Sequence, residues 1–155
     1  MLLIGYGNPG RCDDGLGPAF AARLAARRMP GLTVMSDYQL TVDHALIVSQ
    51  ASPVVFVDAL IDNGAPFRFH AIRPLASHDL TSHSLGPAAV IALAETLYDV
   101  RPEAHVLGIT GHEFGEVREG LSAAARTNLD LAEAFFLEWF ERIPASRAAW
   151  EDADA

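Results

Sequence analysis

The sequence contains no lysine, because all eleven of its Lys+Arg residues are arginine. This absence excludes a lysine Schiff base and a nucleotide-binding P-loop, which both need a lysine amine. Cysteine is also scarce: the single Cys12 excludes an intrachain disulfide and a cysteine-rich zinc site. No apolar run approaches the roughly 20 residues that span a membrane, and the first residues lack the basic flank and long apolar stretch of a signal peptide. We therefore expect a cytoplasmic protein without a membrane span.

Cations are few relative to acids, since eleven arginines against twenty Asp and Glu give a formal charge of −9. Binding of nucleic acid needs clustered cations, so this charge argues against a nucleic-acid partner. A length of 155 residues predicts a single domain. We place this domain at 1–143, followed by an acidic tail at 144–155 that we expect to be frayed, and we expect a monomer.

Short apolar runs alternate with segments rich in alanine and leucine along the chain. They predict buried strands at 2–6, 53–60 and 105–110, a further strand at 32–38, and helices at 15–29, 42–50, 84–98 and 121–142. Apolar and polar residues alternate at 67–75, which is typical of a half-exposed, antiparallel edge strand. Thr41 is the candidate N-cap of the second helix. The order of elements predicts an α/β fold, a three-layer sandwich in which a mostly parallel, twisted five-stranded sheet has helices on both faces.

Ligands of such sheets bind outside the carboxyl ends of the strands, where this sequence carries acidic residues. Asp13 and Asp14 follow the glycine-rich segment 5–10, whose spacing differs from the dinucleotide-binding fingerprint. Two carboxylates there would repel a phosphate and attract a cation, and capping of the next helix explains only one of them. Asp58 ends the most apolar strand, where a carboxylate must be solvated, paired or bound to a cation.

Two histidines, His78 and His83, lie shortly before a predicted helix. Imidazole combined with carboxylates is a suitable ligand set for nickel or zinc. His112 and Glu113 follow a later strand and are weaker candidates for the same role. The histidines inside predicted regular elements are interpreted as structural, namely His44, His70 and His105.

The residues Gly5-Tyr6-Gly7-Asn8, followed by Asp13-Asp14-Gly15-Leu16-Gly17, resemble the opening of the hydrogenase maturation proteases. These endopeptidases trim the large subunit of nickel–iron hydrogenases. Phe56-Val57-Asp58-Ala59 resembles the central strand of the family, and Thr81-Ser82-His83-Ser84 resembles its histidine motif at the start of a helix. The resemblance continues through the last strand and last helix, to about Phe140, while the loop at 111–118 departs from the family pattern and is a candidate for setting which hydrogenase is served.

The resemblance implies a catalytic and nickel-binding site made of Asp14, Asp58 and His83. In the family, the peptidase acts only on a large-subunit precursor that already holds nickel, and it removes a short C-terminal peptide. Nickel is then presented by the substrate, although another divalent metal could occupy the site in vitro. The residues leave open whether water activated by the metal or a carboxylate drives hydrolysis.

Two other functions compete with this interpretation. The segment Gly5-Tyr6-Gly7-Asn8-Pro9-Gly10 also resembles the opening of peptidyl-tRNA hydrolases, which need a histidine shortly after this loop and bind tRNA. Here no histidine precedes His44, and the negative charge opposes tRNA binding. A nickel-dependent chaperone that binds the same precursor without cutting it would carry the same three ligands.

Overall fold

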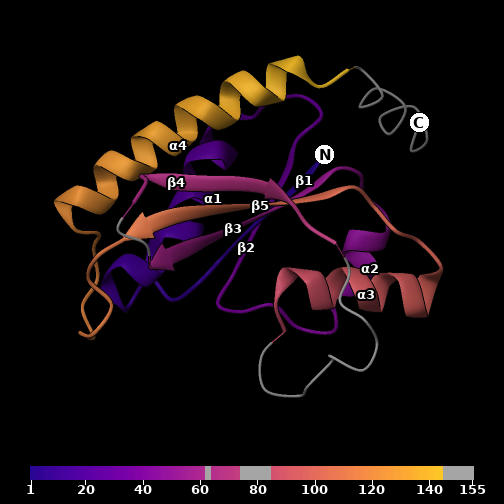
Figure 1. The fold of residues 1–155 in the computed structure, drawn as a ribbon, viewed down its shortest axis with the longest axis horizontal. Coiled ribbons are helices and arrows are strands. Elements are labelled where there is room, and N and C mark those ends of the chain that lie inside the picture. The colour runs from indigo at the N-terminus through magenta and orange to yellow at the C-terminus, as the bar shows by residue number, and fades with distance from the viewer. Residues whose placement is uncertain (62–63, 74–84, 145–155) are drawn as a thin grey trace.

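The computed structural model describes residues 1–61, 64–73 and 85–144. One sheet with the strand order β2-β1-β3-β5-β4 forms the centre of the molecule. Its strands are β1 (Leu2–Tyr6), β2 (Thr33–Asp37), β3 (Val54–Ile61), β4 (Phe67–Ala71) and β5 (Ala104–Gly111). The pairs β1–β2, β1–β3 and β3–β5 are parallel, while β4 runs antiparallel to β5 at one edge. The expected mostly parallel sheet with an antiparallel edge strand is therefore confirmed (Figure 1).

Helices cover both faces of this sheet (Figure 1). The helices α1 (Leu16–Arg27) and α4 (Ala123–Arg142) lie on one face, and α2 (His44–Ser49) and α3 (Pro87–Tyr98) lie on the other. Within β1, Leu3 packs under α1 and α4, whereas Leu2 and Ile4 pack under α2 and α3. Burial on both faces explains why β1 and the run from Val54 to Val57 in β3 are continuously apolar instead of alternating with polar residues.

The starts of the first two helices differ from the sequence expectation. A 3₁₀ turn precedes α1. The N-cap of α1 is Gly15, and no side chain makes a cap bond there. Neither Asp13 nor Asp14 therefore caps this helix. The prediction of Thr41 as an N-cap was also wrong, because α2 begins at His44 and has no side-chain cap. The Thr41 N–H instead donates to Nδ1 of His44 over 2.9 Å.

The other two helices follow the expected chemistry. Pro87 stands in the first turn of α3, where its missing N–H leaves no hydrogen bond unmade. The Ser122 hydroxyl caps α4 by accepting from the N–H of Ala125 over 3.1 Å. The buried face of α4 contains Leu129, Ala132, Phe136 and Phe140.

Within the described part of the chain, no helix combines the length and the apolar character that crossing a bilayer requires. The division into a domain at 1–143 and a tail at 144–155 stays a prediction, since residues 145–155 lie outside the described part.

Candidate active site

A crevice opens at the edge of the sheet between β1 and β3. The chain leaves β1 through α1 toward β2 on one side, while β3 pairs with the other side of β1. Such a switch in strand order is where ligands bind in open α/β sheets, outside the carboxyl ends of the strands. The structure has a pocket of about 250 Å³ here, lined by Tyr6, Gly7, Asp14, Tyr38, Gln39, Leu40, Asp58 and Leu85.

Asp58 extends from β3 into this pocket, where its side chain is half-buried. Its Oδ1 accepts a hydrogen bond from the N–H of Ala59 over 2.7 Å, and its carboxylate also accepts from the Tyr6 phenol. Burial raises the pKa of Asp58 to about 6; these two hydrogen bonds oppose the rise, and the charge of Asp14 adds to it. The two carboxylates therefore repel each other across one pocket, and a cation between them would relieve this repulsion.

Tyr6 is a site residue that the sequence analysis missed. The register of β1 against β3 pairs Gly5 with Val57, so the next residues along, Tyr6 and Asp58, are neighbours. Burial raises the pKa of the Tyr6 phenol well above its usual range, and the charge of Asp58 raises it further. The phenol therefore stays protonated and can donate to Asp58. The sequence showed that Tyr6 ends a strand. It did not show that Asp58 is its neighbour, because the order of strands in the sheet could not be derived from the sequence.

Asp14 reaches the same pocket from the 3₁₀ turn that follows the β1 loop. Its Oδ2 accepts the N–H of Asn8 over 2.8 Å, which fixes the carboxylate against the loop. Gly7 makes this close packing feasible: its φ is +142°, and a Cβ there would lie 2.1 Å from the carbonyl oxygen of Asp14. The glycine of the opening motif is thus required by the position of the turn that carries Asp14.

Asp13, the neighbour of Asp14, has a structural role. It is fully buried and accepts hydrogen bonds of 2.8–2.9 Å from the N–H groups of His112, Glu113 and Ser122 and from the Ser122 hydroxyl. Burial alone would raise the pKa of Asp13, but these hydrogen bonds outweigh it and hold the pKa below its usual value. Asp13 therefore joins the β1 loop to the segment that follows β5.

The weaker candidates His112 and Glu113 contribute backbone N–H groups to Asp13, and their side chains are exposed. They line a separate cavity of about 410 Å³ beside Cys12. This cavity contains neither Asp14 nor Asp58 among its lining residues.

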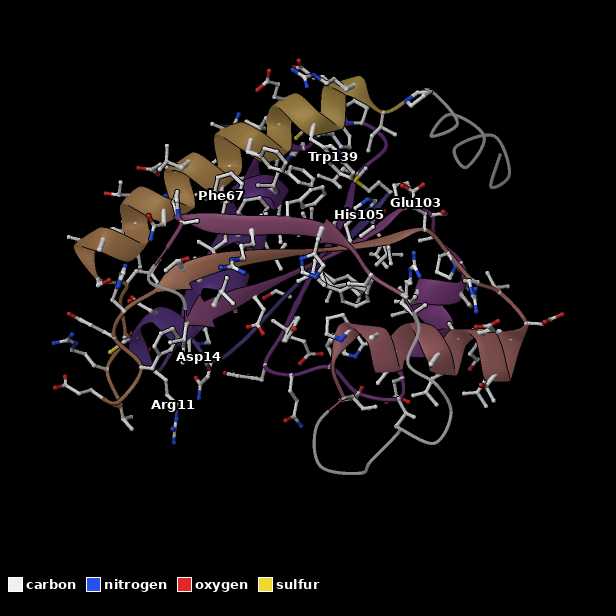
Figure 2. All side chains as sticks on the ribbon, in the orientation of Figure 1. Arg11, Asp14, Phe67, Glu103, His105 and Trp139 are labelled. Atoms are coloured by element: carbon white, nitrogen blue, oxygen red, sulfur yellow. The ribbon has the colours of Figure 1, made fainter. Side chains whose placement is uncertain are left out.

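The histidines taken as structural lie outside the carboxylate pocket. His44 is buried against Thr41, and His70 is exposed on β4. His105 stacks on Phe69, with ring centroids 5.0 Å apart, and meets Trp139 of α4 edge-on. His105 and Trp139 are labelled in Figure 2.

His78 and His83 lie outside the described residues, so the third proposed ligand has no position here. Leu85, the second residue after His83, lines the carboxylate pocket. Over the ranges 1–61, 64–73 and 85–144, no group of three or more His, Cys, Asp or Glu side chains is arranged to hold a metal ion. The structure therefore brings together Asp14 and Asp58, two of the three predicted site residues.

The sequence matches no protein-family model. A comparison with curated proteins also gives no match. Solved structures do match, and several of them are hydrogenase maturation proteases. The [NiFe] hydrogenase maturation protease HycI from Thermococcus kodakarensis KOD1 is 22% identical, with a TM-score of 0.66 over 86% of this chain and 88% of that one. The hydrogenase maturating endopeptidase HybD from E. coli is 15% identical, with a TM-score of 0.68 over 90% and 91% of the two chains.

A third match is the hydrogenase 2 maturation peptidase from Thaumarchaeota archaeon SCGC_AB-539-E09. It is 20% identical, with a TM-score of 0.65 over 90% of this chain and 97% of that one. Identities this low establish a shared fold. The fold of this protein is that of the hydrogenase maturation proteases, as the resemblance in the sequence predicts.

Proposed function

We propose that this protein is an endopeptidase that recognises nickel in the precursor of a nickel–iron hydrogenase large subunit and removes the C-terminal peptide of that precursor. The observation that carries the proposal is the pairing of Asp14 and Asp58 in one pocket at the switch point of the sheet. Solved proteins with the same fold are named for this maturation step, which supports the assignment. We propose that the protein acts as a monomer in the cytoplasm.

Nickel arrives with the precursor in this proposal and is part of the substrate. The carboxylates of Asp14 and Asp58 bind it together with the imidazole of His83. Leu85 lines the pocket, and the two residues from His83 to Leu85 span at most about 7 Å of chain. Two carboxylates and a neutral imidazole suit a borderline divalent ion and leave coordination positions for the substrate's own ligands.

The same pair of carboxylates explains how the enzyme would distinguish a loaded precursor from an empty one. Without a cation, Asp14 and Asp58 repel each other and offer a neutral peptide little attraction. A precursor that delivers a divalent cation satisfies both carboxylates, so the loaded form binds more tightly. Specificity for nickel-loaded substrate then follows from charge alone.

The hydrolysis needs a peptide carbonyl that is polarised and a water that loses a proton. The charge of the delivered ion can polarise the carbonyl, and either the ion or a pocket carboxylate can assist the water. In this proposal, the Tyr6 phenol holds Asp58 in its orientation by donating a hydrogen bond to it. Activation of the water by the ion and activation by a carboxylate both depend on the proposed site residues Asp14, Asp58 and His83.

The proposal is tested by incubating the protein with a nickel-loaded large-subunit precursor and measuring the mass of the precursor's C-terminal region. We expect the loss of a C-terminal peptide with nickel and an intact mass without it. An intact precursor mass combined with a stable complex would show that the protein is a nickel-dependent chaperone and not an endopeptidase. Release of peptide from peptidyl-tRNA would favour the hydrolase alternative.

A further inference from the structure

The most exposed large apolar side chains of the described residues gather at the edge that holds the carboxylate pocket. Val117 is 85% exposed, Ile61 is 78% exposed and Tyr38 is 71% exposed. Tyr38 directly follows β2, Ile61 ends β3, and Val117 lies in the loop after β5. These strands share one direction, so all three residues lie at the carboxyl edge of the sheet. We refer to Tyr38, Ile61 and Val117 as the apolar rim.

The apolar rim extends from the pocket along the same edge of the sheet. Tyr38 itself lines the pocket beside Asp14 and Asp58. Ile61 lies three residues beyond Asp58 on the same strand and pairs with Gly111 of β5. Three strand spacings, or roughly 14 Å, separate β2, which precedes Tyr38, from β5, which precedes the loop of Val117.

The loop that carries Val117 is braced. Its backbone is tied to the β1 loop by the N–H of Cys12, which donates to the carbonyl of Arg118 over 2.8 Å. Asp13 accepts hydrogen bonds from both ends of the same loop, at His112 and at Ser122. Val117 is therefore exposed on a fixed support, and little conformational entropy would be lost when a partner covers it.

Charge at this edge indicates the chemistry of the partner. Acidic residues lie close to the apolar rim in the sequence: Asp37 precedes Tyr38, and Glu113, Glu116 and Glu119 are within four residues of Val117. One cation of this loop, Arg118, is already paired with Glu113 over 2.8 Å and lies 3.6 Å from Glu116. A partner surface that is apolar at its centre and basic around it would complement this edge.

We infer that the apolar rim is the docking surface for the folded body of the large-subunit precursor, which covers it with an apolar, positively charged area while its C-terminal segment occupies the carboxylate pocket. This inference rests on the proposed function. It goes further by separating recognition of the protein body, through Ile61 and Val117, from recognition of nickel, through the pocket. The rim adds affinity for the body of the precursor whether or not it is loaded, and the carboxylates add affinity for the delivered cation and take part in cleavage.

The test uses the full chain and the nickel-loaded precursor of the processing assay. The double variant Ile61→Ser, Val117→Ser removes two apolar contacts at exposed positions, so the fold has no buried contact to lose. We expect at least a tenfold increase in KM for the precursor, with kcat changed less than twofold. The matched control is Leu97→Ser at the far end of α3, where the side chain is 56% exposed, and it should leave KM unchanged.

Association measurements with the same precursor should show rates that fall as salt increases, because the flanking charges are exposed. A double variant that unfolds at the wild-type urea midpoint but retains the wild-type KM would overturn the docking surface. If wild-type protein neither binds nor cleaves the loaded precursor, the proposed function itself is wrong. The two failures are therefore distinguishable.

Discussion

The buried carboxylate of Asp13 accepts hydrogen bonds from both the N–H and the hydroxyl of Ser122, 109 residues later in the chain. The hydroxyl of Ser122 at the same time caps α4 by accepting from Ala125. One carboxylate thus orients the cap of the longest described helix and fixes the loop after β5.

This relationship predicts that Asp13→Asn is strongly destabilising. An amide can accept at only one of its two ends, so buried N–H groups lose their partners. We expect a loss of about 3 kcal/mol in the free energy of unfolding, measured by urea denaturation. Asp14→Asn, at the adjacent residue, is the matched control for stability, because the half-buried side chain of Asp14 loses at most the hydrogen bond from the N–H of Asn8. Equal stability of the two variants would contradict the structural role of Asp13.

The proposed site predicts that Asp14→Asn, Asp58→Asn and His83→Ala each abolish processing of the nickel-loaded precursor. Each change removes one ligand for the cation and leaves the buried core intact, so unfolding should remain cooperative. The mass of the precursor after incubation reports the activity. Asp99→Asn is the control, since Asp99 is an exposed C-cap in the left-handed region that asparagine also tolerates. Wild-type turnover in one of the three variants would remove that residue from the site.

Tyr6→Phe should lower kcat about tenfold, because the loss of one hydrogen bond to a carboxylate corresponds to about 1.4 kcal/mol. KM should change less than kcat if Tyr6 orients Asp58 and does not hold the substrate. Single-turnover cleavage of the loaded precursor separates the two parameters. Tyr98→Phe, at an exposed position on the far end of α3, serves as the control. An unchanged kcat would leave Tyr6 a packing residue.

His105 predicts a pH dependence of stability. Its buried Nδ1 has no hydrogen-bond partner among the described residues, and burial lowers the pKa of the imidazole, which Glu103 partly opposes and His70 reinforces. Because the unfolded chain binds the proton more readily, the contribution of His105 to stability is retained above pH 6.5 and falls as the pH drops toward the lower folded pKa. Asp58, whose pKa is about 6, contributes with the opposite sign in this range, so the difference in urea denaturation between the wild type and a His105 variant from pH 7 to pH 5 measures the contribution of His105.

The variant His105→Phe should remove this contribution to the pH dependence and stabilise the protein at neutral pH by about 1 kcal/mol. A phenyl ring keeps the stacking on Phe69 and the edge contact with Trp139 without a buried polar atom. His112→Phe, at an exposed loop position, is the control and should leave the pH dependence of the wild type unchanged. If His105→Phe kept the pH dependence of the wild type, His105 would not carry this contribution.

Most of the fold could be predicted from the sequence because its signals are local. The run Val54 to Val57 is apolar on both faces, and this alone indicates a strand covered by two helical layers. The alternation from Phe67 to Ala71 indicated the edge strand, which proved antiparallel but ends at Ala71. Helix starts were less accurate, as at Thr41, because caps depend on individual side-chain geometry.

The candidate site could be predicted from the sequence only where the direction of the strands determines which residues lie together. Parallel strands end at one edge, so Asp14 and Asp58 could be expected to converge, and they do. The sequence could not show that Asp13 is structural and that Asp14 faces the pocket, because the hydrogen-bond partners of Asp13 are 99 to 109 residues away. The contact of Tyr6 with Asp58 depends on strand order, which the sequence does not contain. The prediction for His83 remains open, because this residue lies outside the described part.

A single peptide bond joins Asp13 and Asp14, yet one side chain anchors the loop of Val117 and the other faces the pocket. The peptide bond and the hydrogen bonds of Asp13 therefore hold the distance between the pocket and the loop of Val117 nearly constant. In the proposed complex, a precursor bound to the apolar rim would place its C-terminal segment at one fixed position relative to the pocket.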